Sequence, residues 1–244
     1  METCASSKIG REIAFFRVLN IMGLRLNSAL ILGIVAAFSA AAATDDASVL
    51  KPPPGAKVAI VVFEDLECPD CANAYPVVWE AADAHKIPVV LHDFPLPRHS
   101  WSFDAAVWAR YFDTKDTNTR KVGNEFRRFI FANQRQVTRD NLQQWVQKFG
   151  DENKIPVPVS KDPDAGLTEK VKADYALGQR IGVEHTPTIW VVGNNGVSQP
   201  LVEEVKDRAQ LNQMIEDMLA KATPPPPAKK SVPRATKRSS QGAK

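Results

Sequence analysis

The sequence predicts an α/β fold in which a β-α-β unit is followed by a helical insertion and then by a β-β-α unit. Residues 58–63 are continuously apolar and rich in β-branched side chains, as expected of a central strand that is covered on both faces. A helix-compatible segment, 72–85, and a second apolar strand, 88–94, come next. Strand, helix and strand in this order predict two parallel strands joined by a right-handed crossover.

The predicted insertion, at about residues 101–181, has the periodicity of amphipathic helices. Leu142, Trp145, Val146 and Phe149, for example, recur at i, i+3, i+4 and i+7. These apolar faces predict the core of a helical subdomain, and the tryptophans are assigned no cofactor role. The helices are expected over residues 103–112, 120–132, 139–149 and 167–181.

The last predicted unit is a β-hairpin followed by a helix. Residues 188–192 form the first strand, and Asn195-Gly196 is a strong turn signal that pairs it with residues 197–202 in antiparallel fashion. Residues 205–220 then have one apolar face, which predicts an amphipathic helix packed on the sheet.

The N-terminal part of the chain predicts export. The apolar run 29–38 precedes the A-x-A pattern Ala41-Ala42-Ala43, so residues 1–43 are interpreted as a signal peptide. The run is shorter than the ~20 residues that span a bilayer, which favours cleavage over a retained anchor. Residues 44–55, rich in proline, are interpreted as a linker. We therefore expect a periplasmic or otherwise extracytoplasmic protein, in a compartment where disulfides persist.

Residues 222–244 are predicted to form a disordered, Pro-rich basic tail. Residues 221–244 contain seven basic residues, no acidic ones and the run Pro224–Pro227. A solvated tail is the favoured interpretation, and contact with an anionic lipid or cell-wall surface is the alternative. The rest of the sequence has no nucleic-acid-binding motif, so nucleic acid is not expected as a partner.

The clearest functional signal is the segment Glu67-Cys68-Pro69-Asp70-Cys71, between the first predicted strand and its helix. Thiols three residues apart on the first turn of a helix are close enough to form a disulfide. The leading thiol also faces free backbone N–H groups and the positive end of the helix dipole, which stabilise a thiolate. A low-pKa thiolate with a second thiol in reach is the requirement for thiol–disulfide exchange.

Two other interpretations of the cysteine pair are weaker. A structural disulfide closing so small a loop would stabilise the fold only slightly. A zinc site would need two more ligands, and His85, His92, His99 and His185 include no close-spaced pair. No metal or organic cofactor is therefore implied. Beyond the predicted signal peptide the chain has no other cysteine, so its sulfur chemistry is expected to act on other proteins.

Three features together resemble the bacterial DsbA-like thioredoxin-fold thiol–disulfide oxidoreductases with a thioredoxin-4 type domain. They are the strand–Cys-Pro-x-Cys–helix segment, the helical insertion, and Thr186-Pro187 before a β-hairpin. The resemblance covers roughly residues 50–221. It implies a thioredoxin fold with a helical insertion subdomain, and we place this domain at residues 56–221.

By this resemblance Cys68 is the exposed nucleophile and Cys71 the resolving cysteine. Pro187 matches the cis-proline that faces the disulfide, which would leave the backbone of residue 186 free to pair with an extended substrate strand. The residues expected to contact the substrate are Thr186, Pro69, Asp70 and His185.

The sequence departs from the family pattern at two positions. The family usually has a buried acid six residues before the first cysteine, and here that residue is Val62. Glu64, Asp65 or Glu67 is the alternative for this acid, and strand alternation puts Glu64 on the face of Val62 and Asp65 on the other. The favoured interpretation is that all three are exposed charges. His185 stands where the family usually has glycine. It is interpreted either as a loop residue in water or as a cationic neighbour of the first cysteine's thiolate.

The resemblance implies an exported oxidoreductase that oxidises protein thiols through a Cys68–Cys71 disulfide. A membrane redox partner would regenerate the disulfide, and a monomer is expected. A disulfide reductase or isomerase is the first alternative, because a carboxylate at Asp70 disfavours a neighbouring thiolate. A redox-silent module that binds peptides in the thioredoxin groove is the second.

Overall fold

The computed structural model describes residues 50–162, 165–196 and 200–223. The predicted signal peptide, most of the predicted linker and the tail beyond residue 223 lie outside these ranges. No helix within them is long and apolar enough to cross a membrane.

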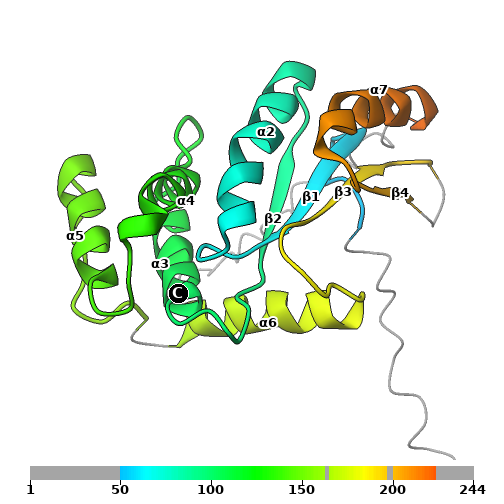
Figure 1. The fold of residues 1–244 in the computed structure, drawn as a ribbon. Helices are drawn as coiled ribbons and strands as arrows, with labels where there is room; N and C mark the ends of the chain where they lie inside the picture. The colour runs from blue at the N-terminus through cyan, green and yellow to red at the C-terminus, as the bar shows by residue number, and fades with distance from the viewer. Residues whose placement is uncertain (1–49, 163–164, 197–199, 224–244) are drawn as a thin grey trace, which may run out of the picture. The chain divides into compact units, whose positions relative to one another are not determined.

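A four-stranded sheet in the order β2-β1-β3-β4 forms the centre of the fold (Figure 1). Strand β1 (Val58–Glu64) pairs in parallel with β2 (Val89–Asp93) and antiparallel with β3 (Thr188–Gly193). Strand β3 pairs antiparallel with β4 (Leu201–Glu204). The parallel pair confirms the predicted β-α-β unit. The antiparallel pair confirms a hairpin, but β4 pairs Leu201 with Gly193 and ends at Glu204, later than the predicted strand 197–202.

Helices cover both faces of the sheet, so every residue of β1 and β3 is buried. On one face, α2 (Pro69–His85) and α7 (Leu211–Lys221) pack against alternate residues of β1 such as Ile60. On the other face, Phe63 meets Phe94, Trp190 and residues of α6 (Gly166–Arg180). Helix α6 comes close at Gly178, where a Cβ atom would lie 2.6 Å from the Phe94 ring.

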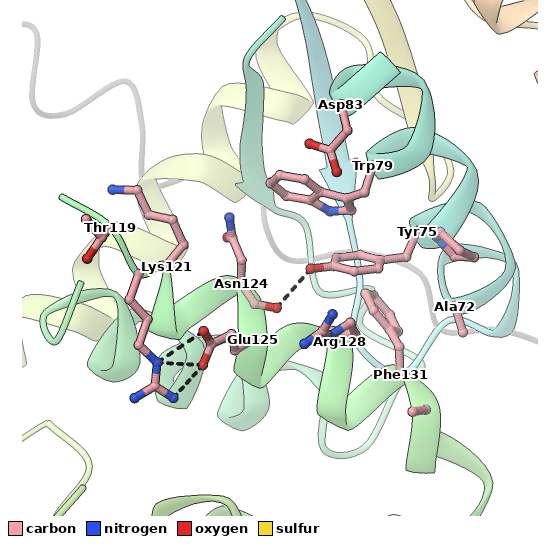
Figure 2. A pocket seen from close by; sticks show the side chains of 13 residues that line it. Ala72, Tyr75, Trp79, Asp83, Thr119, Lys121, Asn124, Glu125, Arg128 and Phe131 are labelled. Carbon is pink, nitrogen blue, oxygen red and sulfur yellow. Dashed lines mark hydrogen bonds and ion pairs between the residues drawn. The ribbon is translucent and has the colours of Figure 1, made fainter. Parts of the chain in front are cut away.

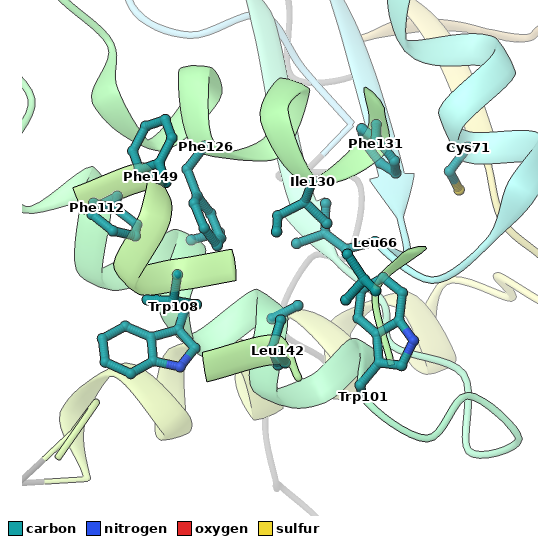
Figure 3. Close-up of a cluster of buried hydrophobic side chains, with 14 of the residues drawn as sticks. Leu66, Cys71, Trp101, Trp108, Phe112, Phe126, Ile130, Phe131, Leu142 and Phe149 are labelled. Atoms are coloured by element: carbon teal, nitrogen blue, oxygen red, sulfur yellow. The ribbon is translucent and has the colours of Figure 1, made fainter. Parts of the chain in front are cut away.

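The predicted helical insertion is confirmed as helices α3 (Ser102–Asp113), α4 (Val122–Asn133), α5 (Leu142–Asn153) and α6. Figure 3 shows the apolar core that α3, α4 and α5 share. The rings of Phe112, Phe126 and Phe149 are in mutual contact there, with centroids 4.6 to 5.2 Å apart. The same core extends to Leu66, Cys68 and Cys71, so the insertion packs directly on the cysteine segment.

The last helix begins later than the sequence predicts. Val205 donates its N–H to the carbonyl of Ile189 at 2.8 Å, which keeps the chain against β3. Asp207 then caps a short 3₁₀ turn, η4 (Arg208–Gln210), by accepting a hydrogen bond from the Ala209 N–H. Only after this turn does α7 start, at Leu211.

Buried charges join the sheet to the insertion. Arg127 of α4 is 1% exposed, and its Nε lies 3.3 Å from Glu64 Oε1 at the end of β1. Its other nitrogens lie 2.8 Å from Asp113 Oδ1 of α3 and 3.5 Å from Asp93 Oδ1 of β2. A buried charge without partners is costly, so these contacts fix α3 and α4 against the carboxyl ends of β1 and β2.

Arg110 of α3 extends this group of charges toward α6. It contacts Asp93 and Asp174, and Asp174 Oδ1 also lies 2.8 Å from His92 Nδ1. We call the whole group the charged cluster: Glu64, His92, Asp93, Arg110, Asp113, Arg127 and Asp174. It links two strands and three helices, among them the strand that leads into the cysteine segment.

We predict that Arg127→Met lowers the free energy of unfolding by about 3–5 kcal/mol, because it leaves Glu64 buried without its cation and Asp93 with Arg110 alone. The matched control is Arg128→Met on the exposed side of the same helix, which should change stability by no more than about 0.5 kcal/mol. Urea unfolding of both variants measures the difference. Equal effects would show that the charged cluster does not hold the insertion on the sheet.

Candidate active site

Cys68 occupies the N-cap position of α2, directly before Pro69. The chain leaves β1 at Glu64 and turns back through a hydrogen bond from the Cys68 N–H to the Asp65 carbonyl at 3.1 Å. Proline suits the first helical position because an N–H group there would have no partner within the helix, so its absence costs nothing. Sequence-local rules therefore place this sulfur at the positive end of a 17-residue helix.

The surroundings of Cys68 lower its pKa to about 5. The largest cause is a hydrogen bond from the Cys71 thiol. Thr186 and the backbone N–H groups of Cys71 and Asp70 lower the pKa further, whereas burial raises it. At neutral pH the group is therefore a thiolate. The predicted thiolate-stabilising position is thus what the structure shows.

Cys71 lies deeper and is 2% exposed. Burial raises its pKa well above the ordinary value, and the neighbouring Cys68 sulfur raises it further. The Asp65 N–H points at the Cys71 sulfur at 3.4 Å. Neither cysteine forms a disulfide in this structure. The pair is chemically asymmetric: Cys68 carries the charge and Cys71 the proton.

The Thr186-Pro187 loop, which the sequence analysis predicts to face the cysteines, covers Cys68. Thr186 lies 118 residues after Cys68 in the sequence. The Thr186-Pro187 peptide bond is cis, and the Thr186 carbonyl lies 3.2 Å from the Cys68 sulfur. Cys68 is consequently only 6% exposed, so the expectation of an exposed nucleophile is wrong for this state. The Thr186 hydroxyl is also buried, and it has no hydrogen-bond partner of good geometry among the described residues.

Glu64 is buried, and its interpretation as an exposed charge is wrong. It is 4% exposed because α4 covers the end of β1. Burial raises its pKa to about 7, although Arg127 opposes the shift. Strand alternation puts Glu64 on the same face as Val62, and both line a small cavity with Cys71 and Pro187. A carboxyl group that can exchange a proton near neutral pH therefore lines the same small cavity as the Cys71 thiol.

Asp65 and Glu67 anchor the cysteine segment to the insertion. Asp65 is 1% exposed, so its interpretation as an exposed charge is also wrong. It accepts hydrogen bonds from the Leu96 N–H and from His99 Nδ1, both at 2.7 Å. Glu67, which is half-buried, accepts the Trp101 N–H at 2.7 Å at the start of α3. These carboxylates serve as backbone caps and are not free surface charges.

Gln134 is a site residue that the sequence analysis missed. Its side-chain amide donates to the carbonyls of Leu66 and Cys68 at 2.8 and 3.0 Å. It follows α4 in a short 3₁₀ turn, and a polar residue at such a place carries no sequence signal of a role. Through this contact the end of α4 holds the backbone on both sides of residue 67.

The remaining predicted contact residues lie on the surface around the thiols. Pro69 and Asp70 are exposed in the first turn of α2, and Asp70 pairs with Arg208 of η4. His185 is exposed, and its backbone carbonyl accepts a hydrogen bond from the Thr188 hydroxyl. The exposure of His185 fits the interpretation as a loop residue in water.

A separate cavity of about 650 Å³ lies between α2 and α4 (Figure 2). Tyr75, Trp79 and Phe131 form its apolar walls, and the Tyr75 hydroxyl donates to the Asn124 carbonyl at 2.9 Å. It begins at Ala72, one residue after Cys71, but neither cysteine lines it. The cysteine pair therefore lies outside this cavity. Within the described ranges no group of His, Cys, Asp and Glu side chains is arranged to hold a metal ion.

Comparison with known proteins matches this architecture. A protein-family model described as thioredoxin matches residues 53–217. No curated protein sequence matches the chain. The solved structure of alpha-DsbA1 from Wolbachia pipientis is similar with a TM-score of 0.56 and 16% identity, over 71% of this chain and 91% of that one. The catalytic domain of Proteus mirabilis ScsC is similar with a TM-score of 0.51 and 18% identity, over 73% and 93%. The predicted DsbA-like thioredoxin fold is confirmed.

We predict that iodoacetamide labels Cys68 much faster than Cys71 in the reduced protein. The rate should rise with a midpoint near pH 5 and level off by neutral pH, because it follows the thiolate fraction of Cys68. Mass spectrometry of the labelled peptides measures both rates. After unfolding in guanidinium, the midpoint should move to about 8.5, the ordinary value of a free cysteine. A midpoint near 8.5 in the folded protein would contradict the assignment.

Proposed function

The chain belongs to the thioredoxin family, and on that premise we propose that it is a thiol–disulfide oxidoreductase that oxidises the thiols of other proteins. The observation that carries the proposal is the asymmetric pair itself: a Cys68 thiolate at a helix N-terminus, a protonated Cys71 behind it, and the Thr186-Pro187 loop in front. The similarity of the fold to that of DsbA and ScsC proteins supports the same activity.

In the proposed reaction the oxidised protein carries a Cys68–Cys71 disulfide. A substrate thiolate attacks the Cys68 sulfur, the S–S bond breaks, and Cys71 leaves and takes up a proton. The second substrate thiolate then attacks the substrate sulfur of the mixed disulfide and releases Cys68 as a thiolate. The substrate loses two electrons and the cysteine pair gains them.

The low pKa of Cys68 favours this direction. In the folded reduced protein the thiolate is stabilised relative to the unfolded chain, and the disulfide form gains nothing comparable. This stabilisation is fully present above the ordinary cysteine pKa and is lost as the pH falls through about 5. At neutral pH the reduced form is therefore the favoured one, which makes the pair an oxidant.

The reductase alternative depended on an unpaired Asp70 carboxylate near the thiolate. In the structure Asp70 Oδ1 lies 2.7 Å from Arg208 Nη2, so its repulsion is largely offset. We also propose export, supported by the apolar run and A-x-A pattern at the N-terminus, and re-oxidation by a membrane partner.

The direct test is oxidation of a reduced peptide with two cysteines, together with a glutathione redox titration. The wild-type protein should oxidise the peptide, and Cys68→Ser and Cys71→Ser should both lose the activity. The reduction potential should lie closer to the about −120 mV of strong oxidants than to the about −270 mV of thioredoxin. A value near −270 mV would favour the reductase, and the absence of any exchange would favour the binding module.

We further predict that Glu64→Gln slows the steps in which Cys71 gains or loses its proton, by up to on the order of 10²-fold. The wild-type rate of mixed-disulfide formation, the step in which Cys71 leaves and takes up a proton, should change with an inflection near pH 7, and the variant should lack it. Glu80→Gln, at an exposed position of α2, is the control and should keep the wild-type profile. Stopped-flow measurement of mixed-disulfide formation decides the point, and an unchanged inflection in Glu64→Gln would exclude the role.

A further inference from the structure

Arg208 reaches from η4 to the cysteine motif. Its Nη2 lies 2.7 Å from Asp70 Oδ1, and its Nη1 lies 3.4 Å from the Asp70 backbone carbonyl. Asp70 stands between the two cysteines in the first turn of α2. We infer that Arg208 is a positioning residue that sets the redox balance of the cysteine pair, by offsetting the Asp70 carboxylate that stands between the two cysteines. This inference rests on the proposed function.

The local structure explains why the arginine stands there. The chain after β4 is held on β3 by the Val205–Ile189 hydrogen bond, and the Asp207 side chain caps the turn that carries Arg208. Strand β3 follows directly on the Thr186-Pro187 loop. The arginine thus comes from the same part of the sheet as the loop that covers Cys68. Its contact with Asp70 joins this part to the start of α2.

The Arg208–Asp70 contact affects the Cys68 thiolate through the charges around the site. An unpaired carboxylate at position 70 would repel the Cys68 thiolate and favour the disulfide. With Arg208 in contact, the repulsion is offset by an attraction between the guanidinium and the thiolate. The pKa of Arg208 is raised, first by its hydrogen bond with Asp70 and in addition by the charge of Cys68. Because that attraction is mutual, it stabilises the reduced form of the pair.

The effect should be moderate, since the Arg208 and Asp70 side chains are 35% and 56% exposed and water screens their charges. For Arg208→Gln we expect the pKa of Cys68 to rise. The equilibrium with glutathione should shift three- to tenfold toward the disulfide form of the protein, roughly 15–30 mV for two electrons. Arg208→Lys, which keeps the charge, should retain most of the wild-type behaviour.

The decisive experiment is a double-mutant cycle of Arg208→Gln and Asp70→Asn. It is read by the ultraviolet absorbance of the Cys68 thiolate against pH and by the glutathione titration. Asp70→Asn should change the pKa of Cys68 much more in the Arg208→Gln background than in the wild type. There it removes an unpaired carboxylate, so the pKa of Cys68 should return close to the wild-type value. Lys206→Gln is the control, because Lys206 is exposed and pairs with Glu204 instead.

The outcomes separate this inference from the proposed function. If Arg208→Gln leaves both the thiolate titration and the potential unchanged, or if the two substitutions do not couple, the inference is wrong even though the protein exchanges disulfides. If the protein does not equilibrate with glutathione at all, the proposed function fails. The thiolate titration of the four proteins then decides the role of Arg208 by itself.

Discussion

The Arg127 guanidinium lies at the point where β1, β2, α3 and α4 meet, and it is surrounded by the carboxylates of Glu64, Asp93 and Asp113. A charge that is buried this completely is tolerated only if its partners stay in place. The position of α4 relative to the sheet is therefore narrowly constrained. Because Gln134 follows α4 and holds the carbonyls of Leu66 and Cys68, the constraint is passed on to the cysteine segment.

The same group of charges contributes to the different behaviour of the two thiols. Cys68 receives hydrogen bonds at the helix N-terminus, whereas Cys71 faces the sheet and the end of β1. Glu64 connects the charged cluster to the cysteine pair: it contacts Arg127 on one side and shares a small cavity with Cys71 on the other. The structural ion pair and the proton-exchanging group of the proposed reaction thus involve one side chain. Weakening the ion pair would also alter the chemistry.

Much of this arrangement could be predicted from the sequence, because local patterns determine it. The β-branched run of β1 and the Cys-x-x-Cys pair before a helix each report on their own neighbourhood, and both appear where expected. The Asn-Gly turn predicts the hairpin but not its register, because β4 begins only at Leu201. The burial of Glu64 could not be predicted, because strand alternation gives the face of a residue but not what covers the strand end. Gln134 and Arg208 were missed for a related reason. Each reaches the site from a segment far away in sequence, and its own neighbours give no hint of the contact.

Cys68 and the threonine carbonyl that covers it are separated by 118 residues, so the two halves of the site are made at different times during synthesis. When the cysteines leave the ribosome, α4 and β3 do not yet exist, and the thiols have the pKa of about 8.5 of an ordinary cysteine. They are then mostly protonated at neutral pH and react slowly. The Thr186 contribution to the low pKa of Cys68 is therefore added only in the finished fold, whereas the contributions of residues 70 and 71 need only the first turn of α2.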